Sequence, residues 1–171
     1  MDIEVKETSL KNVLLIKPPT IFRDFRGSYI ETYNDNLYKI NGVEQKFIQD
    51  CISTSKKNVL RGIHGDSETW KLVSCLYGKF YLLVVNNNKD SDQYMRWCSF
   101  ELSYENNLQV LIPPKFGNGH YVLSDSTIFH YKQTTYYKRE SQFTISWNDP
   151  KFNFKWPSKN PILSDRDKFA K

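Results

Sequence analysis

The feature that most constrains the fold is a succession of short, strand-like segments that are separated by turn residues. Each segment is rich in the β-branched and aromatic side chains that suit a pleated sheet. The segments span residues 13–17, 28–33, 47–53, 58–64, 71–77, 79–86, 94–103, 108–112, 120–123, 127–134 and 142–147. Turn signals recur roughly every 8–12 residues, which is typical of a β-sandwich or β-barrel rather than of alternating strands and helices.

The rest of the chain offers little helix and no sign of a second domain. Gly78 divides two strand-like segments and indicates a tight turn, and the polar run 86–92 indicates an exposed loop. Short helices are expected at 35–40 and at 164–169, the second capped by Ser164. The proline-dense stretch 150–161 contains Phe154 and Trp156, so we expect it to pack as an extended tail. We therefore predict one closed, all-β domain over residues 1–171 with a few short helices.

Charge and cysteine content narrow the classes of function. The formal net charge of +5 is spread over scattered Lys and Arg residues, without the clustered basic face that nucleic-acid binding requires. Cys51, Cys75 and Cys98 form no CxxC motif and cannot all pair, which indicates buried thiols in a reducing compartment. The acidic N-terminus does not resemble a signal peptide, and no apolar stretch reaches membrane-spanning length. We expect a cytoplasmic protein with no nucleic-acid or membrane partner.

His64 has the most distinctive setting among the three histidines. It ends an apolar segment beside Arg61 and lies between Gly62 and Gly65, where a ligand can approach the backbone. An imidazole has a reference pKa of about 6.5, which suits proton abstraction at neutral pH. The alternative is a hydrogen-bonded structural histidine, which is the commoner role of an isolated histidine in a strand.

A metal site is a competing interpretation, because β-barrels of this kind often hold iron or zinc. Such sites need three or four convergent ligands, commonly a His-x-His pair and a carboxylate. Here Asp66 stands two residues after His64, and only Glu68 and His120 remain to complete a set. Because the paired-imidazole spacing is absent, the sequence predicts no metal site.

About ten short motifs in order resemble the dTDP-4-dehydrorhamnose 3,5-epimerase family over nearly the whole chain. The motif FRDFRGSYIE at 22–31 is similar to the family's D-x-R-G-x-F-x-E segment. The later motifs are FIQD at 47–50, STS at 53–55, VLRGIH at 59–64, KLV at 71–73, LS at 102–103 with Asn106, IP at 112–113, VLS at 122–124, YKxT at 131–134, WNDP at 147–150, WP at 156–157 and LSxxD at 163–167. Each motif is weak by itself, but their order is very specific.

The resemblance implies a cupin jelly roll that acts as a homodimer on a nucleotide-diphosphate sugar, with no metal and no nicotinamide. In the implied reaction, a ketone at C4 of the sugar acidifies the protons on C3 and C5. A base removes one proton and leaves an enolate, and reprotonation from the opposite face inverts the centre. Such a site needs a base, an acid across the ring, and a cation or donor for the enolate oxygen.

By the same resemblance, four residues carry this chemistry. His64 falls on the family's base, and Asp167 falls on the carboxylate that orients that base. Lys71 falls on the lysine that stabilises the enolate, and Tyr131 falls on the acid of the opposite face. Each has an ordinary alternative, because a tyrosine can simply pack in a strand and Lys71 and Asp167 can be solvated surface residues. Their presence together, in family order, favours the catalytic interpretation.

The resemblance assigns the nucleotide diphosphate to Arg26, Arg61 and Gln49, with Glu31 nearby. Guanidinium groups suit a diphosphate because each presents a planar fork of donors. Tyr29 falls where the family has an aromatic ring that can stack on the nucleobase. In the family some of these residues come from the neighbouring subunit, so an exchange of the N-terminal strand across the dimer is implied.

Several positions depart from the family pattern, and they cluster around the expected pocket. Asp66 replaces the glutamine of the family's His-x-Gln, and Asn118 replaces a histidine. Lys115 stands where a glycine is usual, and Cys51 stands where an asparagine is usual. Asp66 and Asn118, taken as substrate-binding residues, are short groups that leave room for a bulkier ring. They favour the branch that acts on GDP-linked 4-keto-6-deoxy-heptoses for bacterial capsule over the dTDP-linked hexose.

Three alternatives remain open at this stage. On the same scaffold, related barrels epimerise at C3 alone or carry out 3,4-ketoisomerisation. A non-catalytic, sugar-binding cupin would need the aromatic and arginine residues but not the pair of His64 and Asp167. A metal-dependent cupin oxygenase is the third alternative, and stoichiometric iron or zinc in the purified protein would support it.

Overall fold

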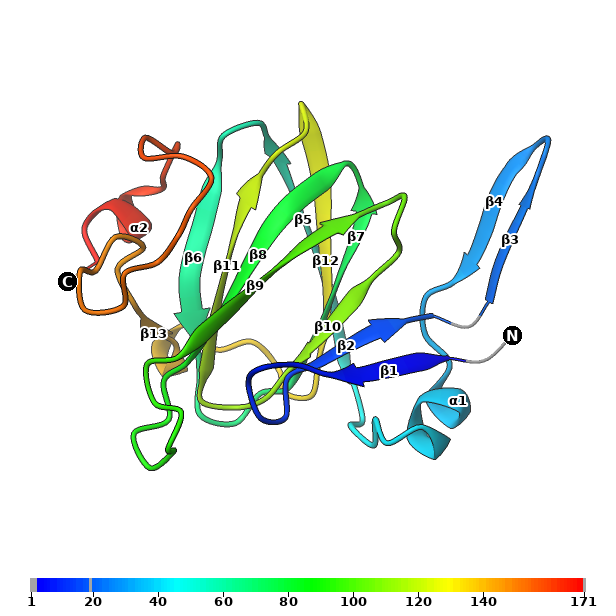
Figure 1. The fold of residues 1–171 in the computed structure, drawn as a ribbon, viewed down its shortest axis with the longest axis horizontal. Coiled ribbons are helices and arrows are strands. Elements are labelled where there is room, and N and C mark those ends of the chain that lie inside the picture. The colour runs from blue at the N-terminus through cyan, green and yellow to red at the C-terminus, as the bar shows by residue number, and fades with distance from the viewer. Residues whose placement is uncertain (1–2, 19, 171) are drawn as a thin grey trace.

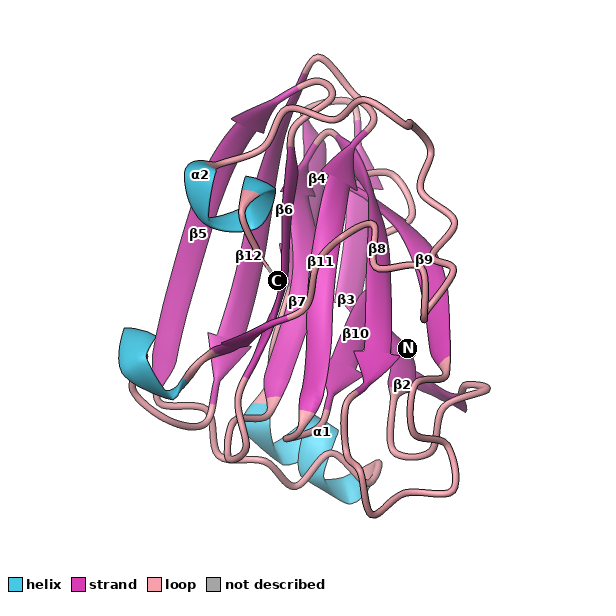
Figure 2. Ribbon diagram, turned by 90° about the vertical axis from the view of Figure 1, so that its left-hand side faces the viewer, coloured by secondary structure: helices cyan, strands magenta, loops and turns pink. Residues whose placement is uncertain are grey.

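Two antiparallel β-sheets pack face to face in the computed structural model, which describes residues 3–18 and 20–170 (Figures 1 and 2). The larger sheet has the strand order β1 (Glu4–Glu7), β2 (Leu14–Lys17), β10 (Gln109–Ile112), β7 (Lys71–Tyr77), β12 (Ser126–Gln133) and β5 (Gln49–Lys56). The smaller sheet has the order β13 (Phe143–Thr144), β6 (Leu60–Gly65), β11 (Phe116–Val122), β8 (Lys79–Asn86) and β9 (Trp97–Ser103). The predicted all-β architecture is confirmed.

Two further strands, β3 (Thr20–Asp24) and β4 (Gly27–Glu31), pair only with each other. In Figure 1 this hairpin stands apart from the two sheets, near the N-terminal strands. The short helix α1 (Asp35–Ile40) follows it, and the 3₁₀ helix η1 (Arg139–Ser141) and helix α2 (Asp165–Lys168) lie near the C-terminal end of the chain. The hairpin joins neither of the two large sheets, and hydrogen bonds from Arg23 to the carbonyl oxygen of Glu105 and between Ser28 and Tyr104 connect it to the rest of the chain.

The core lies between the sheets, where alternate side chains of each strand point inward. Val73 of β7, Phe80 and Leu82 of β8, Val110 of β10 and Phe129 of β12 belong to one buried cluster. Because these strands are distant in the sequence, the period-2 pattern of each one is satisfied only when the sheets close on each other.

The C-terminal tail covers the outer face of the smaller sheet. Phe152, Phe154 and Trp156 pack against a buried cluster that includes Ile63 of β6 and Leu83 of β8. The Trp156 indole donates a hydrogen bond to the carbonyl oxygen of residue 147 at 2.7 Å. The prediction that the proline-dense stretch packs as an extended tail is confirmed.

The sequence correctly predicted the turn at Gly78 and the starts of the two α-helices. Gly78 has a φ of 72° in the turn between β7 and β8, and a side chain there would collide with the backbone of Ser126. Helix α1 has the predicted bounds. Helix α2 begins after Ser164, whose hydroxyl accepts a hydrogen bond from the amide of Asp167.

Other elements differ from the sequence-based expectation. Strands β1 and β3 were not expected, and β11 begins at Phe116 rather than at residue 120. Gly117 and Gly119 interrupt the alternation of apolar and polar residues in β11, because glycine has no side chain that would indicate which face of the strand is buried. All three cysteines are free thiols, as expected, but only Cys75 is buried, whereas Cys51 and Cys98 are half-buried.

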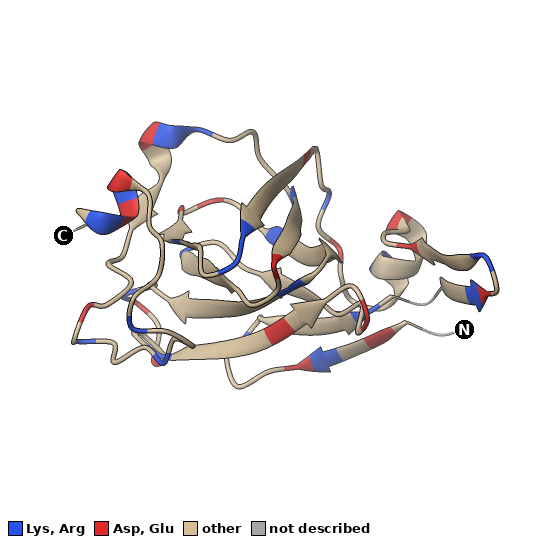
Figure 3. Ribbon diagram, turned by 90° about the horizontal axis from the view of Figure 1, so that it is seen from above, with Lys and Arg blue, Asp and Glu red and all other residues tan. Residues whose placement is uncertain are grey.

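Charged residues of both signs are interspersed along the ribbon, including on the hairpin and on α2 (Figure 3). Within the described part of the chain, no helix is long and apolar enough to cross a membrane.

Candidate active site

A bulge in β6 creates the platform of the site. His64 lies opposite Asn118 of β11, whereas Arg61 lies opposite His120, so three steps along β6 match two steps along β11. This extra residue in β6 turns both Arg61 and His64 toward the same cavity, although regular alternation would put them on opposite faces. Gly62 makes the close approach possible, because a Cβ there would lie 2.7 Å from the carbonyl oxygen of Asn118.

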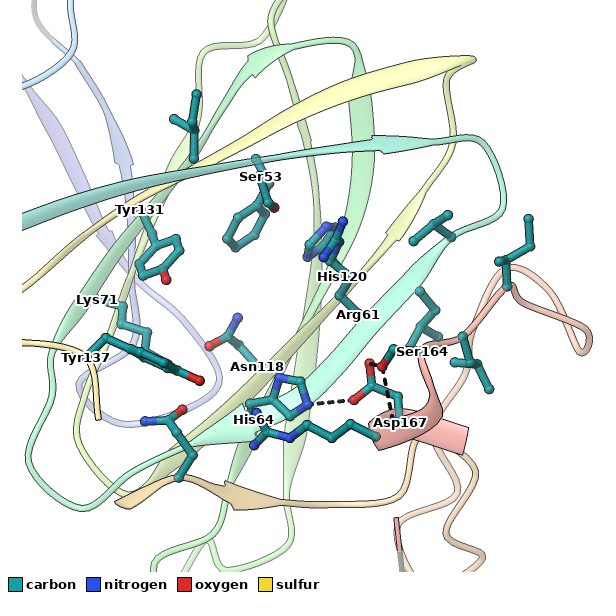
Figure 4. A pocket seen from close by; sticks show the side chains of 18 of the residues that line it. Ser53, Arg61, His64, Lys71, Asn118, His120, Tyr131, Tyr137, Ser164 and Asp167 are labelled. Atoms are coloured by element: carbon teal, nitrogen blue, oxygen red, sulfur yellow. Dashed lines mark hydrogen bonds and ion pairs between the residues drawn. The ribbon is translucent and has the colours of Figure 1, made fainter. Parts of the chain in front are cut away.

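The cavity lies between the two sheets near α2 and has a volume of about 490 Å³. Its polar lining converges from both sheets and from the C-terminal helix (Figure 4). The lining residues with polar side chains are Ser53, Arg61, His64, Lys71, Asn118, His120, Tyr131, Gln133, Tyr137, Gln142, Ser164, Arg166 and Asp167.

His64 and Asp167 form a short, directed pair at one side of this cavity. The Nε2 atom of His64 lies 2.6 Å from Oδ1 of Asp167, which is buried in the first turn of α2. The hydroxyl of Ser164 and the backbone amide of Gly62 donate to the other carboxylate oxygen at 2.9 and 3.3 Å. Burial acts to raise the pKa of Asp167, but the hydrogen bonds from His64, Ser164 and Gly62 outweigh it and hold that pKa below its ordinary value. Asp167 is therefore a charged acceptor that fixes the imidazole.

Tyr131 approaches the cavity from the other sheet. Alternate residues of β12, namely Phe129, Tyr131 and Gln133, line the cavity, whereas His130 points to the outer face. Burial, together with the neighbouring Cys51 thiol, raises the pKa of Tyr131 well above its ordinary value. The phenol consequently keeps its proton at neutral pH and faces His64 across the cavity (Figure 4).

Lys71 stands at the start of β7, opposite Gln133 in the sheet. Burial lowers its pKa, and the positive charge of Arg166 lowers it further, whereas Asp66 acts in the opposite direction. Within residues 3–18 and 20–170, no hydrogen bond or ion pair occupies its ammonium group. A half-buried cation without a partner is suited to an anion or a developing negative charge on a ligand.

Comparison with known proteins matches this chain to one family from residue 7 to residue 171, and that family is described as dTDP-4-dehydrorhamnose 3,5-epimerase. The dTDP-4-dehydrorhamnose 3,5-epimerase of Salmonella typhimurium is 39% identical over 171 residues, which cover 97% of this chain and 93% of that protein. The chain belongs to the dTDP-4-dehydrorhamnose 3,5-epimerase family. Membership makes it an isomerase of nucleotide-linked sugars.

Solved structures of related epimerases share the fold closely. The enzyme of Legionella pneumophila, solved in complex with dTDP-4-keto-L-rhamnose, has a TM-score of 0.92 at 36% identity, covering 98% of this chain and 91% of that one. The enzyme of Bacillus anthracis, solved with TDP and pyrophosphate bound, has a TM-score of 0.94 at 33% identity, covering 99% and 98%. The predicted cupin jelly roll is confirmed by this agreement.

Two residues that were predicted to bind substrate, Asp66 and Gln49, lie outside the cavity and hydrogen-bond to residues that line it. Asp66 accepts hydrogen bonds from the amides of Glu68 and Thr69 and from the side chain of Gln142, so its carboxylate is engaged by the protein. Gln49 accepts from Gln133 at 3.0 Å and from the amide of Tyr137 at 2.8 Å. Neither lines the cavity, and each instead holds side chains that do.

The three N-terminal binding residues lie on the β3–β4 hairpin, outside the cavity of their own chain. Arg26 pairs with Asp24 at 2.6 Å in the hairpin turn. Tyr29 is 65% exposed, and Glu31 accepts a hydrogen bond from Asn34 at 3.3 Å. The structure of one chain therefore brings Arg61 and Asn118 together with His64, but not Arg26, Tyr29 or Glu31.

Several cavity residues were not among those expected from the sequence. His120, Tyr137, Gln142 and Arg166 all line the cavity of the epimerase. Arg166 lies within the motif that contains Asp167. His120 follows Asn118 by two residues, so the alternation of side chains along a strand could have predicted that His120 faces the cavity as well. Among the described residues, no group of three His, Cys, Asp or Glu side chains is arranged to hold a metal ion.

Proposed function

We propose that this chain inverts C3 and C5 of a nucleotide-linked 4-keto-6-deoxy sugar, with His64 as the base and Tyr131 as the acid. The observation that carries the proposal is the 2.6 Å pair of His64 and Asp167, which faces Tyr131 across one cavity. Base and acid on opposite sides of a ring are what an inversion by proton exchange requires.

The hydrogen bond to Asp167 defines the role of each ring nitrogen of His64. Nε2 donates to the charged carboxylate, so the lone pair of Nδ1 is available to take a proton from carbon. As the imidazole becomes charged, the buried carboxylate stabilises it. The C4 ketone makes the adjacent protons acidic, and their removal leaves an enolate.

Lys71 and Tyr131 complete the cycle. The unpartnered ammonium of Lys71 is suited to stabilise the enolate oxygen, which gains its charge only during the reaction. Tyr131 holds its proton at neutral pH because its pKa is raised, so it is able to deliver that proton to the face opposite His64. The proton that His64 removes is replaced on the opposite face by the proton of Tyr131, and His64 then releases a proton to solvent while Tyr131 regains one. Each centre is thereby inverted with no net gain or loss of atoms.

The preferred substrate under this proposal is a GDP-linked 4-keto-6-deoxy-heptose rather than the dTDP-linked hexose. Asn118 is the supporting residue, because it lines the cavity opposite His64 and is shorter than the histidine usual there. Asp66 no longer supports a direct contact, since its carboxylate is bound by Glu68, Thr69 and Gln142. The larger sugar would use the space beside Asn118.

A homodimer is part of the same proposal. Phe22, Phe25 and Tyr29 of the hairpin are 58%, 98% and 65% exposed, which is unusual for large apolar side chains on one short element. A second copy of the chain would cover them and would receive Arg26 and Tyr29 at the mouth of its own cavity. The diphosphate would then lie between Arg61 of one chain and Arg26 of the other.

The test is proton exchange in D2O, followed by NMR. The protein is incubated separately with GDP-4-keto-6-deoxy-heptose and with dTDP-4-keto-6-deoxyglucose. Deuterium at both C3 and C5 is the expected result, and faster uptake with the GDP heptose supports the substrate preference. Uptake at C3 alone would indicate a C3 epimerase. A folded protein that exchanges neither substrate would contradict the proposal.

Tyr131→Phe separates the two halves of the reaction. Removal of the phenol should abolish inverted product, because no acid remains on the opposite face. Exchange on the His64 face should continue, so deuterium would enter without inversion. Epimerisation at the wild-type rate would show that Tyr131 is not the acid.

A further inference from the structure

His120 is a buried polar side chain that the proposed reaction does not use. It is 3% exposed on β11, and its ring stacks on Phe129 with centroids 4.2 Å apart and planes 11° apart. It lines the same cavity as His64 (Figure 4). Within the described chain, its Nε2 atom is buried and has no hydrogen-bond partner. Buried polar groups without a partner are costly and rare, so such an atom at a cavity wall indicates a partner that arrives with the ligand.

The charge state of His120 limits what that partner is. Burial lowers its pKa most and the charges of Arg61 and His64 also lower it, while Asp167 acts in the opposite direction, and the resulting pKa is about 3. The ring is therefore neutral at physiological pH, so it is neither a second base that gains a proton nor a cation. A neutral imidazole offers one N–H donor and one acceptor nitrogen.

Its place along the cavity indicates which end of a sugar it faces. In the larger sheet, Gln133 lies opposite Lys71 and Phe129 lies opposite Cys75, with Tyr131 between them on β12. Four residues of strand span roughly 13 Å, and His120 stacks at the Phe129 end. If Lys71 holds the oxygen on C4, His120 faces the opposite end of the ring, where C1 carries the phosphate.

Arg61 lies at the same level and supplies the charge. It is opposite His120 in the sheet. Its Nε atom donates to the hydroxyl of Ser55 at 2.9 Å, and one terminal nitrogen donates to the carbonyl oxygen of Thr54 at 3.1 Å. These bonds fix the guanidinium, and they leave further donors of its five for a ligand. A fixed cation beside a neutral N–H donor is well suited to a phosphate oxygen.

We infer that His120 binds the sugar-linked phosphate of the substrate, donating a neutral hydrogen bond from Nε2 to an oxygen that Arg61 also contacts. The inference rests on the proposed function, because Lys71 and Tyr131 define the direction of the sugar. It makes His120 a binding residue that holds the anomeric end of the ring while His64 and Tyr131 act on C3 and C5.

The first test uses ¹⁵N-labelled histidine in this 171-residue chain, whose three histidines give a simple spectrum. dTDP and GDP are added separately, because their terminal phosphate occupies the place of the sugar-linked one. We expect the Nε2 resonance of His120 to move to the position of a hydrogen-bonded N–H, with the ring still neutral. Binding of a diphosphate, measured by calorimetry, without any change at His120 would overturn the inference. A change seen only with dTDP-glucose would assign His120 to the sugar instead, and would overturn it as well.

The second test is His120→Phe, which keeps an aromatic ring against Phe129 and removes the donor. The Kd for the diphosphate that binds should rise roughly tenfold or more, as for a hydrogen bond to a charged group. The deuterium-exchange rate at saturating 4-keto substrate should fall less than threefold. His130→Gln is the matched control, since His130 bonds Ser74 on the outer face, and its Kd should be unchanged. An unchanged Kd in His120→Phe would refute the contact.

The two proposals fail in different ways. Loss of exchange with every 4-keto sugar, in a protein whose His120 still responds to a diphosphate, would refute the epimerase mechanism and leave the phosphate contact in place. Normal exchange with an unresponsive His120 would refute the contact alone. Absence of binding by both dTDP and GDP would overturn both. If His120→Phe does not fold, the spectra of the unmodified protein still decide the question.

Discussion

The inner cavity and the β3–β4 hairpin carry candidate substrate-binding residues in opposite structural states. In the cavity, the side chain of His64 is fixed by a partner from a distant part of the chain, because its hydrogen bond to Asp167 joins residues 103 apart. On the hairpin, Arg26 forms an ion pair with Asp24, two residues away, and Phe25 is almost fully exposed. The cavity is thus built from side chains of one chain, whereas under the proposed homodimer the exposed residues of the hairpin would be covered by a second chain.

Removing the proposed base, His64, should lower the activity more than any other substitution in the cavity or the hairpin. His64→Asn should lower the rate of deuterium exchange by about 10²–10⁴, because general-base catalysis contributes that much. The thermal unfolding temperature should change little, since the His64 ring is partly exposed in the cavity and not part of the apolar core. Exchange that stays near the wild-type rate would mean that the cavity, however ordered, is not where the proton is removed.

Lys71→Met should cause the second-largest loss of activity. We expect exchange to fall by about 10²–10³, as for loss of one group that stabilises an oxyanion. The pH profile gives a second measurement. Because burial lowers the pKa of Lys71, its charge is present below that lowered value and is lost as the pH rises through it. The wild-type rate should therefore decline on the alkaline side at a lower pH than an ordinary lysine would give, and this decline should be absent in Lys71→Met.

Asp167→Asn tests whether the cavity is organised by charge or only by shape. The amide keeps the volume but cannot remain a charged acceptor for Nε2 of His64, so the imidazolium loses its partner. Exchange should fall roughly 10²-fold, at the lower end of the contribution of a general base. A matched variant, Asp165→Asn in the same helix turn, should have wild-type activity. Equal activity of both variants would argue against an orienting role for Asp167.

The hairpin should give the smallest effect, and it should appear in KM rather than in kcat. Arg26→Ala combined with Tyr29→Ala should raise KM roughly tenfold, because hydrogen bonds to a charged group are lost while the base and acid remain. An unchanged KM would show that the hairpin does not reach any substrate site.

Mixing two defective proteins would show whose cavity the hairpin serves. If the hairpin completes the partner's site, a mixed dimer of His64→Asn and the Arg26→Ala/Tyr29→Ala variant contains one intact site. At low substrate concentration, refolded 1:1 mixtures should then recover about a quarter of the wild-type rate, from random pairing in a two-site dimer. If the hairpin served its own chain, mixing would restore nothing.

The sequence predicted much of the inner barrel because local patterns agreed with the final packing. Alternation located β7, β8 and β12, and Asn34 and Ser164 cap α1 and α2 at the expected starts. The prediction failed at β1, at β3 and at the beginning of β11. Strand β3 has no partner except β4, and β11 contains two glycines, so neither gave the apolar alternation that marks a half-buried strand.

Residue types in a fixed order were enough to predict the strand-rich architecture and the family, and to name His64, Tyr131, Lys71 and Asp167 as candidates. Which of these residues line one cavity became known from the folded chain. The bulge in β6 turns the side chains of Arg61 and His64 toward one face. The carboxylate of Asp66 accepts a hydrogen bond from the amide of Thr69 in the following loop and does not line the cavity. Among the residues that the structure describes, Nε2 of His120 has no hydrogen-bond partner. The physical reason is that register and burial are set by pairing between distant strands, which no local pattern specifies.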